Sequence, residues 1–268
     1  MINDIDNPEK YVSLFLGKAV DIISANYYGK LDYDRLFLGA LSGMVNTLDE
    51  YSNVIPAYTQ SEQTDYEKER PETVLSTLMR VGEYSIGVIK IFSFTEYTSN
   101  ELRHVIEEYK EKEIKNVLID LRDNQGGSVS SLISTSELLV GSQRLFYAKD
   151  KKGNITEYKT ESEGAPFTKL AILVNKKTKS AAEMLAMVLQ EGGALVCGEK
   201  TYGKSVSQTD FSVGGVTLRI TTKEYYSYRR GSYNERGIKP DLYLPNMENL
   251  EEEKLLEKAI EQIFLNNV

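Results

Sequence analysis

The chain has 268 residues, enough for one large domain or two small ones with a hydrophobic core. Its 32 basic and 40 acidic residues give a net charge of −8, which argues against nucleic acid as the main partner, because phosphate binding needs a basic face. The single cysteine excludes an intrachain disulfide, and one cysteine with one histidine, His104, cannot build a zinc site of the Cys/His type.

The chain shows neither a membrane-spanning segment nor an export signal. No apolar run approaches the ~20 residues that cross a bilayer. The N-terminal MINDIDNPEK is acidic and polar, unlike a signal peptide. The compartment therefore stays open. It is cytoplasmic if the chain begins here, and extracytoplasmic (periplasmic, secreted or membrane-associated) if a leader was removed.

Residues 1–56 are predicted to form a helical region. Pro8 can open a helix, and Asp32 can cap a second one, so the two make a helical hairpin. Residues 57–83 follow, and the stretch YTQSEQTDYEKERP within them is nearly free of aliphatic side chains. This range is predicted to be a linker.

Residues 84–246 alternate apolar strands with helices. The runs at 116–121 and 170–174 are continuously apolar, as expected of strands covered on both faces. Residues 141–168 contain a predicted hairpin with its turn at 151–154. The pattern indicates an α/β core with a mixed sheet and helices packed on it. Residues 247–268 are predicted to form an amphipathic C-terminal helix.

Ser180 begins the helix that follows strand 170–174, and two interpretations compete. Ser180-x-x-Glu183 is a capping box, the commoner explanation for such a pattern. A serine at a helix N-terminus is also placed to act as a nucleophile, because the positive end of the dipole stabilises a developing alkoxide. The N–H of Ala181 is then available as one donor of an oxyanion hole.

Lys204 and Gln208 could complete such a site. Lys204 follows Gly203 and precedes an apolar strand, and a lysine desolvated there has a lowered pKa and can take a proton from serine. Gln208 falls on the same face of an extended segment, so its amide oxygen can hold the lysine amine. The alternatives are a surface lysine and an exposed strand residue.

Two further features bear on catalysis. His104 lies in a charged amphipathic stretch and is predicted to be an ordinary helix residue, so the base must be something other than histidine. Gly126 and Gly127 follow a buried strand. They form a turn on any interpretation, and glycine there lets a backbone N–H face a substrate carbonyl as the second oxyanion donor.

Four segments in this order resemble the C-terminal processing peptidases, the tail-specific serine proteases of peptidase family S41: DLRDNQGG, LVNKKTKSAAEMLAMVLQ, GEKTYGKSVSQ and GIKPD. By this resemblance Ser180 matches the nucleophile, Lys204 the general base and Gln208 the residue that orients the lysine. Gly126 and Ala181 match the backbone positions of the oxyanion hole. The resemblance implies a core related to the ClpP and crotonase folds, with no metal or cofactor.

The sequence departs from the family pattern at three places. Lys179 stands next to the nucleophile where the family has a small residue, and Gln125 replaces a proline, which we expect to loosen the turn. The linker at 57–83 stands where family members carry a PDZ domain and is too short to hold one. We therefore expect a site that tail binding does not regulate.

The sequence thus predicts a serine endopeptidase that cleaves flexible polypeptides near their C-termini through an acyl-enzyme. The alternative is a non-catalytic peptide-binding or scaffold protein on the same fold. A crotonase-like acyl-thioester enzyme would share the Gly-Gly loop but would leave Lys204 and Gln208 unexplained. The apolar faces of the terminal helices make a homodimer a further expectation.

Overall fold

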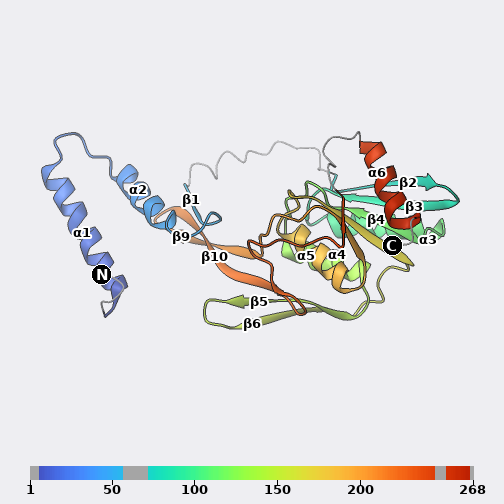
Figure 1. Cartoon of the computed structure of the whole chain (residues 1–268). Helices are drawn as coiled ribbons and strands as arrows, with labels where there is room; N and C mark the ends of the chain where they lie inside the picture. The colour runs from blue at the N-terminus through green and yellow to red at the C-terminus, as the bar shows by residue number, and fades with distance from the viewer. Residues whose placement is uncertain (1–5, 57–71, 245–251, 266–268) are drawn as a thin grey trace. The chain divides into compact units, whose positions relative to one another are not determined.

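The computed structural model describes residues 6–56, 72–244 and 252–265 (Figure 1). These residues form two compact units: those before 57 together with 209–220, and the remainder. The sequence placed 209–220 in the core at 84–246. This segment groups with the N-terminal helices because strand β1 (Asn53–Ile55) pairs with β10 (Val216–Ser227) inside it.

The smaller unit contains the two predicted N-terminal helices. Helix α1 spans Pro8–Asn26 and α2 spans Tyr33–Val45, with Asp32 capping α2 by accepting the N–H of Arg35 at 3.0 Å. Buried residues are found on α2 but none on α1. Among the described residues, no helix combines the length and apolarity needed to cross a membrane.

The larger unit is built on a six-stranded sheet in the order β12-β8-β7-β4-β3-β2. All neighbouring pairs are parallel except β2 with β3, so the predicted mixed sheet is confirmed. The strands are β2 (Val74–Val81), β3 (Tyr84–Ile91), β4 (Asn116–Asp120), β7 (Lys169–Val174), β8 (Leu195–Gly198) and β12 (Leu242–Tyr243).

Strand β2 lies inside the range 57–83 that the sequence predicted as a linker. It pairs with β3 along its whole length, from Val74↔Ile91 to Val81↔Tyr84, so residues 74–81 are the edge of the sheet. An edge strand is half exposed and mixes polar with apolar side chains, which explains why its sequence did not read as core. Residues 57–71 of the predicted linker lie outside the described residues.

Helices cover both faces of this sheet, because successive strand residues point to opposite sides. Ile89, Ile119 and Ile172 pack against one group of helices, and Val88 and Leu118 pack against the C-terminal segment. The first group comprises α3 (Thr98–Glu111), α4 (Val129–Leu139) and α5 (Ala181–Glu191). The C-terminal segment is α6 (Glu252–Ile260) with the π-helical turn η4 (Glu261–Leu265).

A second sheet is centred on β10, which pairs with β1, β5, β9 and β11. The predicted hairpin is β5 (Gln143–Asp150) with β6 (Ile155–Thr160), and β9 and β11 span Val206–Val213 and Gly231–Ser232. Leu145 and Phe146 of β5 share one apolar core with residues of α4 and α5. These helices therefore pack on both sheets.

Candidate active site

Ser180 stands at the N-terminus of α5, between strand β7 and the helix. Its backbone has φ 56° and ψ −121°, in the left-handed half of the map that glycine favours and that strains any other residue. Residues 181–190 of α5 are all buried, so the helix is fixed on every side. The structure therefore holds Ser180 in a conformation that a helix cap does not need, since N-cap residues ordinarily lie in the extended region.

The loop before Ser180 is tied to the end of strand β4. Thr178 Oγ1 donates to the carbonyl of Leu121 at 2.9 Å, and the N–H of Lys179 donates to the carbonyl of Asn124 at 2.9 Å. The side chain of Gln125 donates to the carbonyl of Lys177 at 3.0 Å. The amide of Gln125 thus bridges the two loops, and the looser turn expected in place of proline stays a prediction.

Glu183 joins the Ser180 loop to the Lys204 loop. Its side chain is fully buried, and one carboxylate oxygen accepts the N–H of Ser180 at 2.9 Å and the N–H of Lys204 at 2.8 Å. The two backbone nitrogens therefore lie no farther apart than the sum of these distances. The other oxygen accepts the hydroxyl of Thr201 at 2.5 Å and the N–H of Gly203 at 2.6 Å.

The Glu183 carboxylate accepts hydrogen bonds from these four donors. Burial raises the pKa of its carboxyl above the ordinary value, while the hydrogen bonds from Thr201, Lys204, Gly203 and Ser180 act to lower it. The predicted capping box is present, with the Ser180 side chain facing the N–H of Glu183 and the Glu183 side chain accepting the N–H of Ser180. The sequence indicated this box, but not the bonds from Glu183 to the Lys204 loop.

Lys204, Gln208 and Thr221 form a line of side-chain hydrogen bonds. Lys204 Nζ donates to Gln208 Oε1 at 3.1 Å, and Gln208 Nε2 donates to Thr221 Oγ1 at 2.9 Å. Lys204 is half-buried, and Gln208 lies on β9, which pairs with β10. The sequence predicted the contact between Lys204 and Gln208. It did not predict the contact with Thr221, because Thr221 lies on β10 and only the fold brings it to Gln208.

The glycine loop packs directly against the nucleophile candidate. A Cβ on Gly126 would lie 2.9 Å from Ser180 Cβ, and one on Gly127 would lie 2.2 Å from the carbonyl oxygen of Phe94, so neither position admits a side chain without a shift. Both have positive φ, 99° and 146°. Glycine is required here by close approach as well as by conformation.

The two glycine N–H groups differ in availability. The N–H of Gly126 donates to Asn124 Oδ1 at 2.8 Å, whereas the exposed Gly127 has no acceptor for its N–H among the described residues. Ala181 is the first helical residue, where N–H groups lack an intrahelical partner. Of the three predicted oxyanion positions, Gly127 and Ala181 therefore offer open donors in this conformation, and Gly126 shapes the loop.

A buried ion triad fixes the start of the glycine loop. Arg122 binds Asp120 through two side-chain bonds at 2.9 and 2.6 Å, and Lys90 Nζ reaches the same carboxylate at 3.0 Å. Asp120 is 1% exposed and Arg122 8% exposed. Removing one partner of such a set leaves an uncompensated buried charge. Sequence reasoning treated Asp120 and Arg122 only as part of a motif and missed this role.

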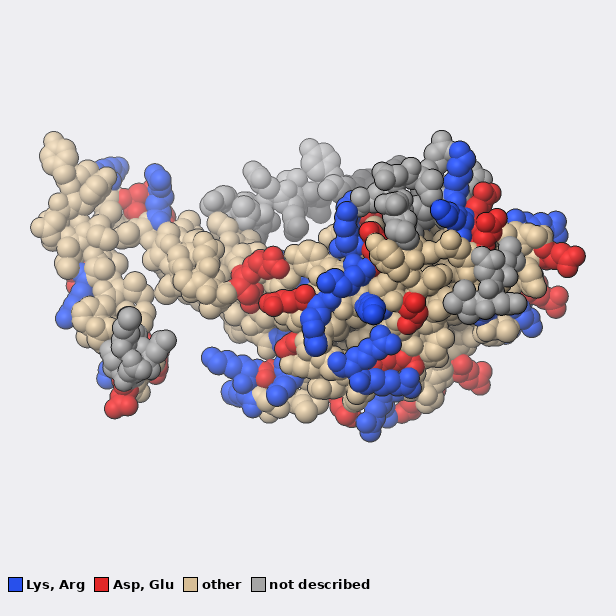
Figure 2. Space-filling model, in the orientation of Figure 1, with Lys and Arg blue, Asp and Glu red and all other residues tan. Residues whose placement is uncertain are grey.

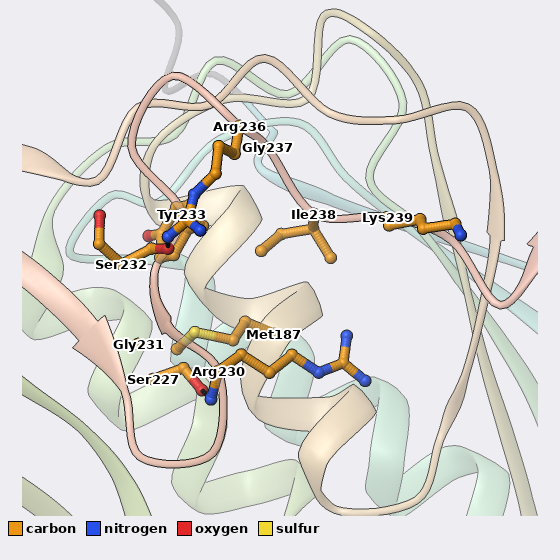
Figure 3. Close-up of a pocket in the computed structure, with 10 residues that line it drawn as sticks. All are labelled: Met187, Ser227, Arg230, Gly231, Ser232, Tyr233, Arg236, Gly237, Ile238 and Lys239. Carbon is orange, nitrogen blue, oxygen red and sulfur yellow. Dashed lines mark hydrogen bonds between the residues drawn. The ribbon is translucent and has the colours of Figure 1, made fainter.

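Other candidate sites offer less. His104 is exposed on α3, 3.8 Å from Glu107, so its prediction as an ordinary helix residue is confirmed. Among residues 6–56, 72–244 and 252–265 no cluster of metal-binding side chains occurs. A cavity of about 180 Å³ beside α5 is lined by Arg230, Arg236 and Lys239, but their charged ends point in different directions (Figure 3).

Comparison with known proteins places these features in one family. The model of peptidase family S41 matches residues 85–244. The chloroplastic carboxyl-terminal-processing peptidase 2 of Arabidopsis thaliana is 35% identical over 164 residues, which are 60% of this chain and 32% of that protein. The carboxy-terminal processing protease CtpA of Bacillus subtilis is 32% identical over 174 residues, 64% of this chain and 37% of that protein. The chain thus spans only about a third of these relatives.

Solved structures share the fold. The photosystem II D1 C-terminal processing protease aligns with a TM-score of 0.63 at 24% identity, covering 70% of this chain and 53% of that one. A lipoprotein from Streptococcus agalactiae aligns with a TM-score of 0.61 at 18% identity, covering 87% and 82%. The mixed α/β fold with two sheets, of the ClpP/crotonase-like type, is as predicted.

Proposed function

This chain belongs to peptidase family S41, and we propose that it is a serine endopeptidase with Ser180 as nucleophile, Lys204 as general base and Gln208 as the residue that orients the lysine. The observation that carries this proposal is the hydrogen bond from Lys204 Nζ to Gln208 Oε1 at 3.1 Å, in a loop that shares the Glu183 carboxylate with Ser180. No metal or cofactor takes part.

In the proposed reaction, neutral Lys204 takes the proton of the Ser180 hydroxyl as its oxygen attacks the scissile carbonyl. The N–H groups of Ala181 and Gly127 donate to the oxyanion of the tetrahedral intermediate. Lys204 then protonates the leaving amine, and the acyl chain stays on Ser180. A water molecule, deprotonated by Lys204, releases it.

The strained backbone of Ser180 supports a catalytic role over a capping role. Non-glycine residues at positive φ cost about 1–3 kcal/mol and persist where function demands them. A scaffold or peptide-binding protein would need neither this strain nor the Lys204–Gln208 contact. No specific observation favours that alternative or an acyl-thioester enzyme.

Flexible polypeptides cut near their C-termini are the proposed substrates. The support is the activity for which the relatives are named, carboxyl-terminal processing. The proposal thus assigns the relatives' activity to a chain that spans about a third of their length.

Covalent labelling tests the proposal. A serine-directed phosphonate should add to wild-type protein, and peptide mapping by mass spectrometry should find the adduct on Ser180. Labelling should disappear in Ser180→Ala and slow by about 100-fold or more in Lys204→Ala, because the hydroxyl then lacks its base. Equal labelling of wild type and Lys204→Ala would refute the proposed base.

A further inference from the structure

The lysine directly before Ser180 is held against an aromatic ring of the neighbouring loop. Lys179 Nζ lies 3.9 Å from the centroid of the Tyr202 ring, and the N–H of Tyr202 donates to the carbonyl of Thr178 at 3.0 Å. A cation over an aromatic face is attracted by the ring quadrupole. A half-buried positive charge is thus fixed one residue from the candidate nucleophile.

A groove of about 420 Å³ lies at the Thr221 end of the hydrogen-bonded series Lys204–Gln208–Thr221. Thr221, which accepts the hydrogen bond from Gln208, is one of its lining residues. Three lysines also line it: Lys149 and Lys151 at the end of β5, and Lys223 on β10. Figure 2 shows basic side chains gathered at this end of the β5–β6 hairpin.

The groove's lysines and carboxylates differ in what they already bind. None of the three lysines makes an ion pair with another described residue. Asp150 accepts bonds from Lys152 and Asn154 of its own turn, and Glu224 is bound by Tyr226 and Ser232. The groove therefore carries three lysine charges against the two carboxylates of Asp150 and Glu224, so its net charge is positive and suits a carboxylate ligand.

We propose that this site selects polypeptides with acidic side chains close to the scissile bond, with Lys179 as the specificity-determining residue and the groove lysines as a secondary contact. The inference rests on the proposed peptidase function. Lys179, beside Ser180, contacts the substrate residue next to the cleaved bond. Lys149, Lys151 and Lys223 contact a residue farther along the chain.

The net charge of −8 opposes acidic substrates at long range, so the local charges must prevail at contact. Physiological salt screens exposed charges beyond about 8 Å, which confines the repulsion from distant carboxylates. Lys179 is half-buried, and a half-buried charge is screened less than an exposed one. The preference for acidic substrates should therefore shrink, but survive, as salt rises.

Paired peptides that differ only in Glu against Gln test the proposal. With the Glu walked along both sides of the scissile bond, wild type should show kcat/KM about fivefold higher for the best Glu peptide than for its Gln partner. Lys179→Met should lose this preference, while Lys179→Arg should keep it. Lys177→Met is the matched control, because Lys177 lies on the same loop and is paired with Asp123 at 3.5 Å.

Binding to Ser180→Ala, followed by fluorescence anisotropy, separates recognition from catalysis. Tighter binding of Glu than Gln peptides, lost on adding Lys179→Met, would support the inference even if wild type cleaved neither peptide. Failure of wild type to cleave either peptide would refute the proposed peptidase function, but not the preference for acidic side chains. Equal binding and equal turnover of the Glu and Gln peptides would overturn the inference, and so would a preference unchanged in Lys179→Met.

Discussion

At the scale of single residues, Ser180 carries backbone strain that its proposed role as nucleophile explains. Its φ of 56° and ψ of −121° suit glycine. A nucleophile, however, needs the hydroxyl of the serine side chain, which glycine lacks. The sequence could indicate the helix start and the serine, because Ser-x-x-Glu before an apolar helix is a strong signal. It could not indicate the strained conformation, which the two loops around Ser180 impose.

This strain predicts opposite effects on stability and activity. Ser180→Gly should raise the free energy of unfolding by about 1 kcal/mol and the melting temperature by about 2–4 °C, because glycine accepts this backbone conformation, while cleavage is lost. Ser180→Ala should leave the melting temperature nearly unchanged. Calorimetry checks both. A drop of several degrees in Ser180→Ala with activity retained would instead support the capping interpretation.

Glu183 is the residue on which both catalytic loops converge. Glu183→Gln removes the charge and replaces one acceptor oxygen with a donor that faces N–H groups. We expect the free energy of unfolding to fall by about 2 kcal/mol. We also expect kcat to fall about 100-fold with little change in KM, because Ser180 and Lys204 lose their relative position.

Substitutions of Thr201, whose hydroxyl donates to the Glu183 carboxylate, test the same contact from the other side. Thr201→Ser keeps the hydroxyl that Glu183 accepts and should behave as wild type, whereas the isosteric Thr201→Val should lower kcat in the direction of Glu183→Gln. Chemical denaturation and steady-state kinetics measure the two effects. Normal kcat in Glu183→Gln would show that the catalytic loops do not depend on this contact.

At the scale of elements, the strands and helices of the core were largely predictable. Strands β4 and β7 are mostly apolar, and the all-buried α5 follows Ser180 at once, so periodicity and capping signals agree. Edge strand β2 was missed because half of its side chains face solvent. The Asp120–Arg122–Lys90 triad was missed because it joins two strands whose pairing is set only by the fold.

The glycine loop gives a prediction at this scale. Gly126→Ala places a Cβ 2.9 Å from Ser180 Cβ and from the carbonyl oxygen of Lys179, and it strains a residue with φ 99°. The loop must move, and with it the N–H of Gly127. We expect activity to fall about 100-fold or more.

Gly82→Ala is the matched control for the backbone strain alone. Gly82 has φ 61°, and a Cβ there would meet no atom within 4 Å, in the turn between β2 and β3. It should cost stability without a comparable loss of activity per folded molecule. Equal activity loss in both variants would mean that strain alone, and not the oxyanion loop, explains Gly126→Ala.

At the scale of the whole molecule, the exposed apolar surface of α1 predicts self-association. Leu14 is 55% exposed, Phe15 46% and Ile22 64%, and α1 has no buried residue in the described chain. Monomeric proteins rarely expose a contiguous apolar patch of this kind. We expect light scattering after size exclusion to give about twice the chain mass of 30.3 kDa.

A double change tests whether α1 carries the association. Leu14→Glu with Ile22→Glu should give a monomer, because buried carboxylates would oppose the interface. Lys10→Glu with Lys18→Glu changes charge on the same helix without removing apolar area and should leave the dimer weakened at most. A wild-type mass equal to that of the single chain, 30.3 kDa, would reject the dimer.

Catalysis by Ser180 and Lys204 is the central claim, and digestion of an unfolded protein such as β-casein tests it most directly. Wild type, Ser180→Ala and Lys204→Ala are compared at equal concentration, with folding of each verified by its melting temperature. We expect wild type to cleave casein and both folded variants to have lost cleavage. Casein cleaved as fast by either variant as by wild type would contradict it.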